Sequence, residues 1–512
     1  MKLKVKAINY ESGNKKEVIL NIKDTLELGQ KAGERIRIKN IKSKSIEDRY
    51  WVAILEIDHS NNIVNSGEIG FPLDLLEEKR DIKEDMTVSV KPADPPDSFR
   101  FIQKKIKAEK LNSEEINSII RDAVSGSLSR IDLAAFITAV SINGMDGDEM
   151  TALTLAEARS GDIFNFGENV FDKHSTGGVP GNKVSLIIVP IVAAAGLTIP
   201  KSSTRAITSP SGTADSMEVL APVAFEYEEL RSIVSKENAC IIWGGALNTA
   251  PADNILIEIE RPLHMDPVGL MIPSILTKKL SLGVKRLVLD VPCGLGTKFP
   301  TADNGKEFAY IFKEIAKNVG IQAECALTLA HQPIGHAVGP AIEAIEALNL
   351  LMDYSKGPNS LIEKSTDLAG ILLEMGGKAQ RGKGQMLAKE LLRTGKAYEK
   401  MRKIIEAQGG DPNIKPEDIE LGPYEKEFFA VKSGHITEVN NKIINLIAKT
   451  AGCPHSKRSG VMIIKKQGAR IKEGELVFKI YSDSKSKLNR AEKIYNSTGG
   501  PIVLGGMMIE RI

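Results

Sequence analysis

Hydrophobic periodicity changes along this chain of 512 residues, and each period is compatible with a different class of structure. In residues 1–92, alternating runs such as KLKVKAINY and RYWVAILEI are separated by the turn signals SGN and HSNN. Short strands at such regular spacing predict a small N-terminal β domain, either a barrel or a sandwich. The Pro- and Asp-rich stretch KPADPPDS at 91–98 then predicts a linker.

After the linker, the apolar residues recur at helical spacing. Ser113 is the expected N-cap of one helix, and Ile116, Ile119 and Ile120 share one face of it. Two further runs, IDLAAFITAVSI and DEMTALTLAEA, have the same period. Residues 99–165 are therefore predicted to form a bundle of about three or four helices.

Beyond the bundle, apolar and β-branched runs alternate with helix-like stretches. The runs are VSLIIVPIVAAAG at 184–196, ACIIWGG at 239–245, KRLVLDVPCG at 285–294 and AECALTLA at 323–330. This alternation predicts an α/β domain with a largely parallel sheet flanked by helices. The whole chain is thus expected to be a multidomain α/β protein.

The last part of the chain, residues 423–512, predicts an α+β domain. HITEVNNKIINLIAKTAG at 435–452 is its helix candidate, and VMIIKKQGARIKEGELVFKIYS predicts a hairpin. Its shape resembles the barrel-sandwich fold of lipoyl and biotinyl carriers. Lys465 and Lys466 are not expected to carry an acyl group, because that turn requires a lysine between two hydrophobic residues.

Composition excludes several classes of function. The chain has 68 Lys and Arg against 66 Asp and Glu, so its charge suggests neither nucleic acid nor a membrane surface as partner. Neither a leader-like segment nor a membrane-length apolar stretch is evident, which indicates a cytoplasmic protein. The four cysteines form no C-x-x-C pair, which argues against both a disulfide framework and a zinc site. No cofactor or metal is expected.

The stretch FDKHSTGGVPGNKVSL at 171–186 has the composition of an anion-binding loop. Gly177, Gly178 and Gly181 permit close backbone approach, and a helix-compatible run follows them. Lys173 adds a charge, and Ser175 adds a hydroxyl donor. The alternative is a flexible turn with a solvated lysine, and this loop alone leaves the two interpretations nearly balanced.

A second loop favours the anion site. KSSTRAITSPSGTADSMEVL at 201–220 places seven hydroxyl side chains, from Ser202 to Thr213, around Arg205 and again leads into a helical pattern. Two such loops predict a site for more than one anionic group. Because neither loop has the spacing G-x-x-x-x-G-K-[ST], hydrolysis of nucleoside triphosphates is disfavoured.

DKHSTGGV and the helix after it resemble the signature of the thymidine and pyrimidine nucleoside phosphorylases, from about residue 99 to the C-terminal domain. The resemblance implies that about 245–285 joins the helical domain, and that 166–244 and 286–422 form the phosphate-binding α/β domain. It implies a phosphate site formed by Lys173, Ser175, Ser185, Ser203 and Thr213. It also implies that Ser274 and Lys278 of PSILTKK hold the base.

RAITSPSGTAD differs from the pyrimidine enzymes and resembles anthranilate phosphoribosyltransferase, whose substrate carries a ribose 5-phosphate. With its added N-terminal domain, the whole chain resembles the archaeal AMP phosphorylases. This resemblance implies conversion of AMP and phosphate to adenine and ribose 1,5-bisphosphate in AMP catabolism, with CMP and UMP as additional substrates. The implied AMP contacts are Gly178, Thr204, Arg205, Ala206, Ile207, Thr208, Ser209, Thr213, Ser274 and Lys298.

The same resemblance implies that Asp266, in RPLHMDPVGLMIPS, donates a proton to the departing base. Its apolar sequence neighbours are expected to favour the protonated carboxyl near neutrality. From the residues alone, an ordinary turn aspartate before Pro267 is the favoured interpretation, and only the resemblance reverses that order.

Three other functions compete with this one. A pyrimidine nucleoside phosphorylase would act on nucleosides without a 5′-phosphate, and a non-catalytic AMP-binding regulator would release no base. Phosphoribosyl transfer would require Mg²⁺, but no Asp/Glu cluster lies near the glycine loops in the sequence. The expected partners are AMP, phosphate and further copies of the same chain, as a homodimer or larger homo-oligomer.

Overall fold

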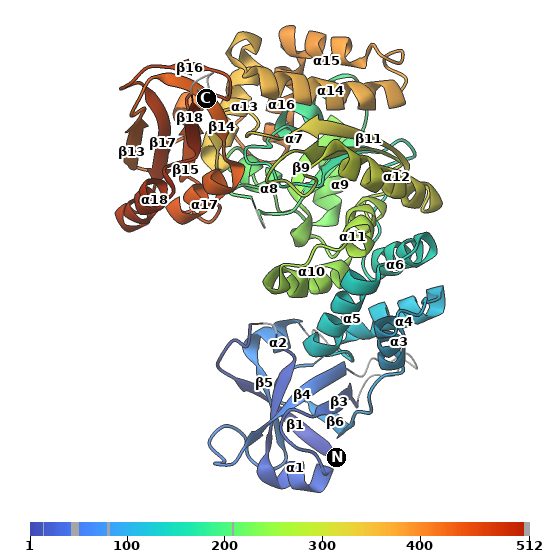
Figure 1. Ribbon diagram of the computed structural model, residues 1–512. Coiled ribbons are helices and arrows are strands. Elements are labelled where there is room, and N and C mark those ends of the chain that lie inside the picture. Colours follow the sequence, from blue (N-terminus) through green and yellow to red (C-terminus); the bar gives the residue numbers. More distant parts are fainter. Residues whose placement is uncertain (14, 42–50, 79–81, 207–208, 506–512) are drawn as a thin grey trace. The chain divides into compact units, whose positions relative to one another are not determined.

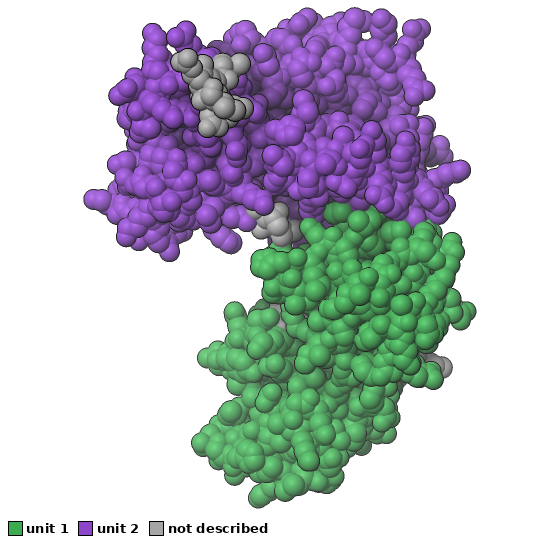
Figure 2. Space-filling view, viewed as in Figure 1, with its two compact units in different colours: residues 1–160, 250–273 green, residues 161–249, 274–512 purple. Residues whose placement is uncertain are grey.

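The computed structural model describes residues 1–13, 15–41, 51–78, 82–206 and 209–505. The chain divides into two compact units, shown in different colours in Figure 2. The first unit holds residues 1–160 and 250–273, and the second holds residues 161–249 and 274–512. The chain therefore passes between the units three times, after residues 160, 249 and 273.

Six strands at the start of the first unit close into a barrel, blue in Figure 1. Buried residues such as Leu3 and Val5 alternate with exposed ones, as a strand period of two requires. Two short helices accompany the strands, α1 (Ile22–Leu28) and α2 (Leu73–Glu78). The barrel strands, in the order β1-β5-β2-β4-β3-β6, are β1 (Lys2–Ile8), β2 (Glu17–Asn21), β3 (Arg35–Asn40), β4 (Trp51–Asp58), β5 (Glu68–Pro72) and β6 (Thr87–Pro92).

The rest of the first unit is helical. Its helices are α3 (Ser98–Ile106), α4 (Ser113–Ser125), α5 (Arg130–Asn143), α6 (Gly147–Arg159) and α10 (Pro251–Leu263). Capping boxes at Asn112, Ser129 and Asp146 begin α4, α5 and α6. The cap of α4 is therefore Asn112 and not the predicted Ser113, because the Asn112 side chain accepts the Glu115 N–H.

Five parallel strands form the sheet of the second unit. They are β7 (Phe171–Ser175), β8 (Ile199–Ser203), β9 (Ala239–Trp243), β10 (Arg286–Cys293) and β11 (Gln322–Leu329). Three of them pair in the order β11-β10-β7, and β8 pairs with β9. A parallel bridge between Val170 and Thr198 connects the two groups just before β7 and β8 begin.

Helices surround this sheet (Figure 1). They are α7 (Ser185–Ala194), α8 (Thr213–Met217), α9 (Tyr227–Glu237), α11 (Val268–Leu280), α12 (Ala302–Asn318), α13 (Pro340–Met352), α14 (Asn359–Met375), α15 (Gly384–Arg393) and α16 (Lys396–Ala407), with the 3₁₀ turns η1 (Gly244–Ala246), η2 (Tyr354–Lys356) and η3 (Pro416–Asp418). The apolar run 184–196, predicted both with the sheet strands and as the helix after the first loop, forms the helix α7. This helix is buried on all sides, so its sequence lacks the polar face that distinguishes a helix from a buried strand.

Two small sheets form the C-terminal part, in the orders β12-β15-β17-β13 and β16-β14-β18. Their elements are β12 (Ala337–Val338), β13 (Tyr424–Phe429), β14 (Gly434–Val439), α17 (Asn441–Ala451), β15 (Gly460–Ile463), β16 (Arg470–Ile471), β17 (Leu476–Ser482), α18 (Lys485–Thr498) and β18 (Ile502–Gly505). The helix predicted over 435–452 is wrong in its first third. HITEV pairs as β14 with its Ile436 and Val439 buried, and Asn440 caps the helix that follows.

No helix in the described ranges is long and apolar enough to cross a bilayer. The most apolar of those named above, α7, has only 10 residues, whereas a spanning helix needs about 20.

A buried ion pair connects two helices of the first unit. Lys105 Nζ lies 2.7 and 2.9 Å from the two carboxylate oxygens of Glu149, and both side chains are less than 5% exposed. Glu149 also accepts the N–H of Leu111 at 2.9 Å. Since α3, α6 and the segment just before α4 all meet at this carboxylate, it fixes their mutual packing.

We therefore expect Lys105→Met to destabilise the helical part of the first unit by about 3–5 kcal/mol, because it leaves a buried carboxylate unpaired. Hydrogen exchange of peptides from α4 and α6 measures this loss as faster amide exchange. Arg100→Met, which removes an exposed ion pair to Asp97, is the control and should change exchange little. Equal exchange in both variants would contradict the structural role of the buried pair.

Candidate active site

Both loops singled out in the sequence leave the same edge of the parallel sheet. Residues 176–184 follow β7, and residues 204–212 follow β8. The bridge between Val170 and Thr198 sets these strands side by side and parallel, so their carboxyl ends lie together. In open α/β sheets, ligands bind beyond the carboxyl ends of the strands. The topology therefore brings the two predicted loops to one region.

Glycines let the first loop lie against its neighbours. Gly178 has φ +87°, and a Cβ there would lie 3.5 Å from the backbone N of Lys298. A Cβ on Gly181 would lie only 2.6 Å from the carbonyl O of Ile334, so a side chain at Gly181 would clash. The predicted AMP contacts Gly178 and Lys298 are thus neighbours, although about 120 residues separate them in the chain.

Lys183 holds the end of this loop. It is 1% exposed, and its Nζ donates to the carbonyls of Ile334 and Ala337 at 3.0 and 2.9 Å. The same ammonium lies 2.6 Å from Glu346 Oε2. Three oxygens around one buried charge fix the loop against the segment before α13, a contact that the sequence did not predict.

Asp290 of β10 is a fully buried carboxylate that contacts two of the predicted phosphate-binding residues, Lys173 and Ser175. Its Oδ2 accepts the Ser175 hydroxyl at 2.8 Å and lies 2.9 Å from Lys364 Nζ and 3.9 Å from Lys173 Nζ. Its Oδ1 accepts the Thr328 hydroxyl at 2.6 Å. Ser175 points its proton at this carboxylate, so here it organises the loop, and its contact with phosphate stays a prediction.

A second buried carboxylate has the same kind of surroundings. Asp172 Oδ2 lies 2.6 Å from Lys279 Nζ, and its Oδ1 lies 3.5 Å from Lys201 Nζ. Each aspartate thus has two lysines beside it, and all six side chains are more than nine-tenths buried. With every group ionised, the cluster of Asp172, Lys173, Lys201, Lys279, Asp290 and Lys364 has two positive charges in excess. Buried charge of one sign requires a counter-charge, so the cluster suits a dianion such as phosphate.

Burial changes the titration of these groups. It lowers the pKa of Lys173 to about 8, which Asp290 opposes and the charge of Lys364 reinforces. It lowers the pKa of Lys201 to about 7, and Asp172 opposes that change. Burial raises the pKa of Asp290, but Lys364 and Lys173 outweigh it and hold that pKa at about 2. Asp290 therefore stays ionised, while Lys173 and Lys201 are close to losing protons at neutral pH.

His174 follows Lys173 on β7 and is also affected. Burial is the main cause that lowers the pKa of His174 well below the usual value, and the charges of Lys279, Lys201 and Lys278 lower it further. Its imidazole is therefore neutral at neutral pH. Because Lys278 acts on His174 together with the buried lysines, the predicted base-binding residue lies near the predicted phosphate site.

The second loop is folded around Asp215. The Asp215 carboxylate accepts the backbone N–H groups of Ala206 and Gly212 at 2.7 and 2.9 Å. Arg205 donates to Glu218 at 2.7 Å and lies 4.8 Å from the centre of the Trp243 ring. In this structure, the Arg205 guanidinium thus holds the loop.

The remaining predicted residues fall as follows. Ser203 ends β8, Ser185 begins α7 and Thr213 begins α8, so all three border the carboxyl edge of the sheet. Lys278 donates to Ser274 at 2.9 Å on α11. Thr204 and Ser209 lie in the second loop, and Ile207 and Thr208 lie outside the described residues.

Asp266 belongs to the first unit. It lies in the segment between α10 and α11, two residues before α11 begins, and its side chain is exposed. Within the first unit, Asp266 is therefore not buried among the apolar residues that the sequence predicted around it. Its catalytic role stays a prediction.

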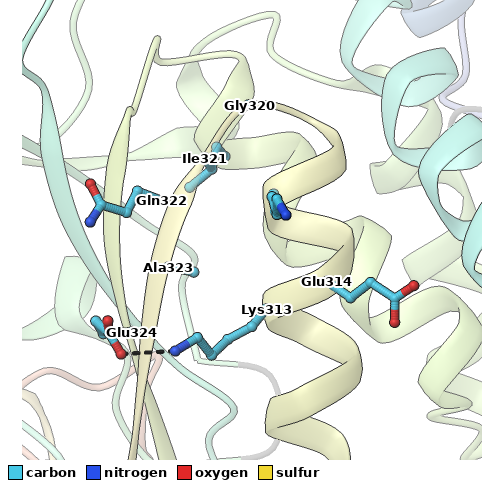
Figure 3. Close-up of a pocket in the computed structure, with 8 residues that line it drawn as sticks. Lys313, Glu314, Gly320, Ile321, Gln322, Ala323 and Glu324 are labelled. Carbon is cyan, nitrogen blue, oxygen red and sulfur yellow. Dashed lines mark hydrogen bonds and ion pairs between the residues drawn. The ribbon is translucent and has the colours of Figure 1, made fainter.

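A groove elsewhere on the second unit lies away from these residues. Lys313, Gly320, Gln322 and Glu324 are among its lining residues, and an ion pair of 3.0 Å joins Lys313 to Glu324 (Figure 3). Because Gln322 and Glu324 are at the start of β11, the groove lies at the amino ends of the strands. It contains none of the predicted site residues.

Five members of the buried cluster were not predicted as site residues: Asp172, Lys201, Lys279, Asp290 and Lys364. Asp290 lies inside the apolar run VLDVP. A charged residue within a buried apolar run is itself a signal, because such a charge persists only with a partner. That signal could have identified Asp290, but not which lysines surround it.

Known proteins match this chain over its whole length. Residues 167–398 match the glycosyl transferase family a/b domain, and residues 100–161 match the helical bundle domain of the same family. AMP phosphorylase from Thermococcus kodakarensis is 46% identical over 513 residues, which cover 100% of this chain and 99% of that protein. AMP phosphorylase from Methanosarcina mazei is 45% identical over 513 residues, which cover 100% of this chain and 98% of that protein.

A solved structure of anthranilate phosphoribosyltransferase from Thermus thermophilus also matches. It has 20% sequence identity and a TM-score of 0.50, covering 60% of this chain and 98% of that chain. At this identity, the match concerns the fold alone. With the family matches, it confirms the predicted helical bundle and α/β domains within a multidomain α/β chain.

We expect anion binding at the buried cluster to weaken as the pH rises from about 7 to 9. The protonated lysine attracts the anion, and raising the pH through pKa values of about 7 and 8 removes protons from Lys201 and Lys173. The fall approaches about tenfold per pH unit for each proton lost. Calorimetry with sulfate measures it cleanly, because the charge of sulfate is constant over this range.

Lys449→Met is the control for this measurement. Lys449 lies on α17, and burial lowers its pKa too, but it is no part of the cluster. This variant should leave the pH dependence unchanged. A sulfate affinity that is constant from pH 6 to 9 would show that the cluster does not bind the anion.

Proposed function

This chain belongs to the family of AMP phosphorylases, and we propose that it cleaves AMP with inorganic phosphate to give adenine and ribose 1,5-bisphosphate. It is a pentosyltransferase of AMP catabolism and acts on CMP and UMP as additional substrates. The observation that supports this most is the cluster of four lysines and two aspartates at the carboxyl edge of the sheet. Its excess of two positive charges suits a phosphate dianion that must be held as a nucleophile.

Phosphorolysis makes two demands on the protein. A phosphate oxygen forms a bond to C1′ while the bond from C1′ to the base nitrogen breaks, through a transition state with oxocarbenium character. Holding the phosphate in line makes the reaction effectively intramolecular, which lowers the barrier by up to about 7–11 kcal/mol in favourable cases. Lys173 and the backbone N–H groups of the first loop supply that orientation.

The base takes the electron pair of the broken bond, so it leaves most readily as a neutral molecule. Asp266 protonates adenine at N7, and general acid catalysis of this kind contributes about 10²–10⁴-fold. The second loop receives AMP, with its 5′-phosphate, through the contacts from Thr204 to Ser209 and Thr213. Ser274 and Lys278 hold the base on α11.

Three finer predictions on organisation belong to the same proposal. Residues 423–512 have the carrier-type fold, for which the two small packed sheets are the support. The chain forms homo-oligomers, supported by Ile131 and Ile142 of α5, which are 82% and 76% exposed. The protein acts in the cytoplasm.

Release of free base separates the competing functions. We expect adenine to be released from AMP with phosphate, and no base to be released from adenosine or uridine. Release from nucleosides alone would support a pyrimidine nucleoside phosphorylase. AMP binding without release of base would support a non-catalytic regulator. Chromatographic separation of base from substrate provides the measurement.

Asp266→Asn tests the proton donor. Because an amide cannot supply the proton, we expect turnover of AMP to fall about a hundredfold or more while AMP binding is retained. Asp148→Asn, which changes an exposed aspartate of α6 in the same unit, is the control and should leave turnover unchanged. Unchanged turnover in Asp266→Asn would remove Asp266 from its role.

A further inference from the structure

Lys364 lies far from every motif of the sequence, yet its charge is in the anion site. It occupies α14, where Leu361 and Leu368 are fully buried. Its own side chain is 6% exposed, and its Nζ lies 2.9 Å from Asp290 Oδ2. A lysine in so apolar a position loses its hydration, and only a close carboxylate compensates that loss. Asp290 is that carboxylate.

Two ammonium groups compete for this one carboxylate oxygen. Lys173 Nζ lies 3.9 Å from Asp290 Oδ2, beyond hydrogen-bonding distance, whereas Lys364 Nζ is 1 Å closer. The closer ammonium therefore neutralises most of the aspartate charge. The Lys173 ammonium is therefore less fully compensated by Asp290 than the Lys364 ammonium is.

We propose that Lys364 is a positioning residue of the phosphate site: by pairing with Asp290, it leaves the Lys173 ammonium available for the anion. Without Lys364, Lys173 is the nearest buried cation to Asp290 and closes on it. The site then contains a neutral ion pair where it had an excess positive charge. The inference rests on the proposed function, because the anion is the phosphate of that reaction.

This role differs from simple packing of α14 against β10. A packing defect would disturb the sheet edge as a whole and would affect AMP and phosphate alike. Loss of the Lys364 charge would weaken phosphate binding more than AMP binding. This effect on phosphate binding would also disappear when the aspartate charge is removed together with the lysine charge.

The decisive experiment is a double-mutant cycle between Lys364 and Asp290. In Lys364→Met, we expect the dissociation constant and the KM for phosphate to rise about tenfold or more, and the KM for AMP to stay within about twofold. In Lys364→Met/Asp290→Asn, Lys173 has no carboxylate to close on. Its phosphate affinity should recover to within about threefold of the unmodified protein.

The double variant has three lysines and one aspartate in the cluster and so keeps an excess of two positive charges, whereas Lys364→Met leaves an excess of one. A conservative variant protects the test against misfolding. Lys364→Arg preserves the charge and should retain most of the phosphate affinity. Lys389→Met is the matched control. It removes a lysine of α15 that pairs with Glu363, the residue next to Lys364 on α14, and that lies outside the site. That control should leave both KM values unchanged.

A pH profile gives an independent readout. The titratable groups around Lys173 are Asp290 of β10, Lys364 of α14, Asp172 and His174 of β7, Lys279 of α11 and Lys201 of β8. Removing the positive charge of Lys364 raises the pKa of Lys173, so the alkaline loss of phosphate binding should move to higher pH in Lys364→Met. A change of packing alone would not move it.

Two results would overturn the inference. One is a double variant that binds phosphate as weakly as Lys364→Met. The other is a KM for AMP that rises in parallel with the KM for phosphate. Because calorimetry measures phosphate binding without turnover, failure of this inference is distinct from failure of the proposed function, in which the unmodified protein would release no adenine from AMP.

Discussion

The site of the second unit depends on two aspartates buried among four lysines. Asp172 and Asp290 come from adjacent strands, β7 and β10, and their lysines come from β7, β8, α11 and α14. Each carboxylate thus fixes the position of several elements and stabilises the charge on its lysines. The ion pairs of this cluster hold these elements together. Because the cluster has more lysines than aspartates, it still attracts a dianion.

The residues proposed to take part in the reaction are divided between the two units. The two glycine- and hydroxyl-rich loops and the buried cluster belong to the second, and Asp266 belongs to the first. Helix α11 follows Asp266 directly in the chain. It begins two residues after Asp266 and contains Ser274, Lys278 and Lys279. The proton donor of the proposed reaction and the residues proposed to hold the base are thus on one short stretch of chain.

Local patterns in the sequence were enough to predict the glycine loops and the succession of β, helical and α/β segments. They gave two answers for α7, which is apolar all round, and they failed in HITEV, where five residues suit a strand or a helix. They also missed the buried cluster, because Lys364 and Asp290 meet only through the packing of α14 on β10. Pairing across such distances in the chain has no periodicity that could reveal it.

The stacking of Arg205 on Trp243 has a spectroscopic consequence. The chain has two tryptophans, Trp51 in the barrel and Trp243 at the end of β9, one in each unit. A guanidinium 4.8 Å from the indole centre alters the emission of that ring. Movement of Arg205 away from Trp243 would therefore change the intrinsic fluorescence of the second unit, so the protein contains its own optical reporter for rearrangements of the second loop.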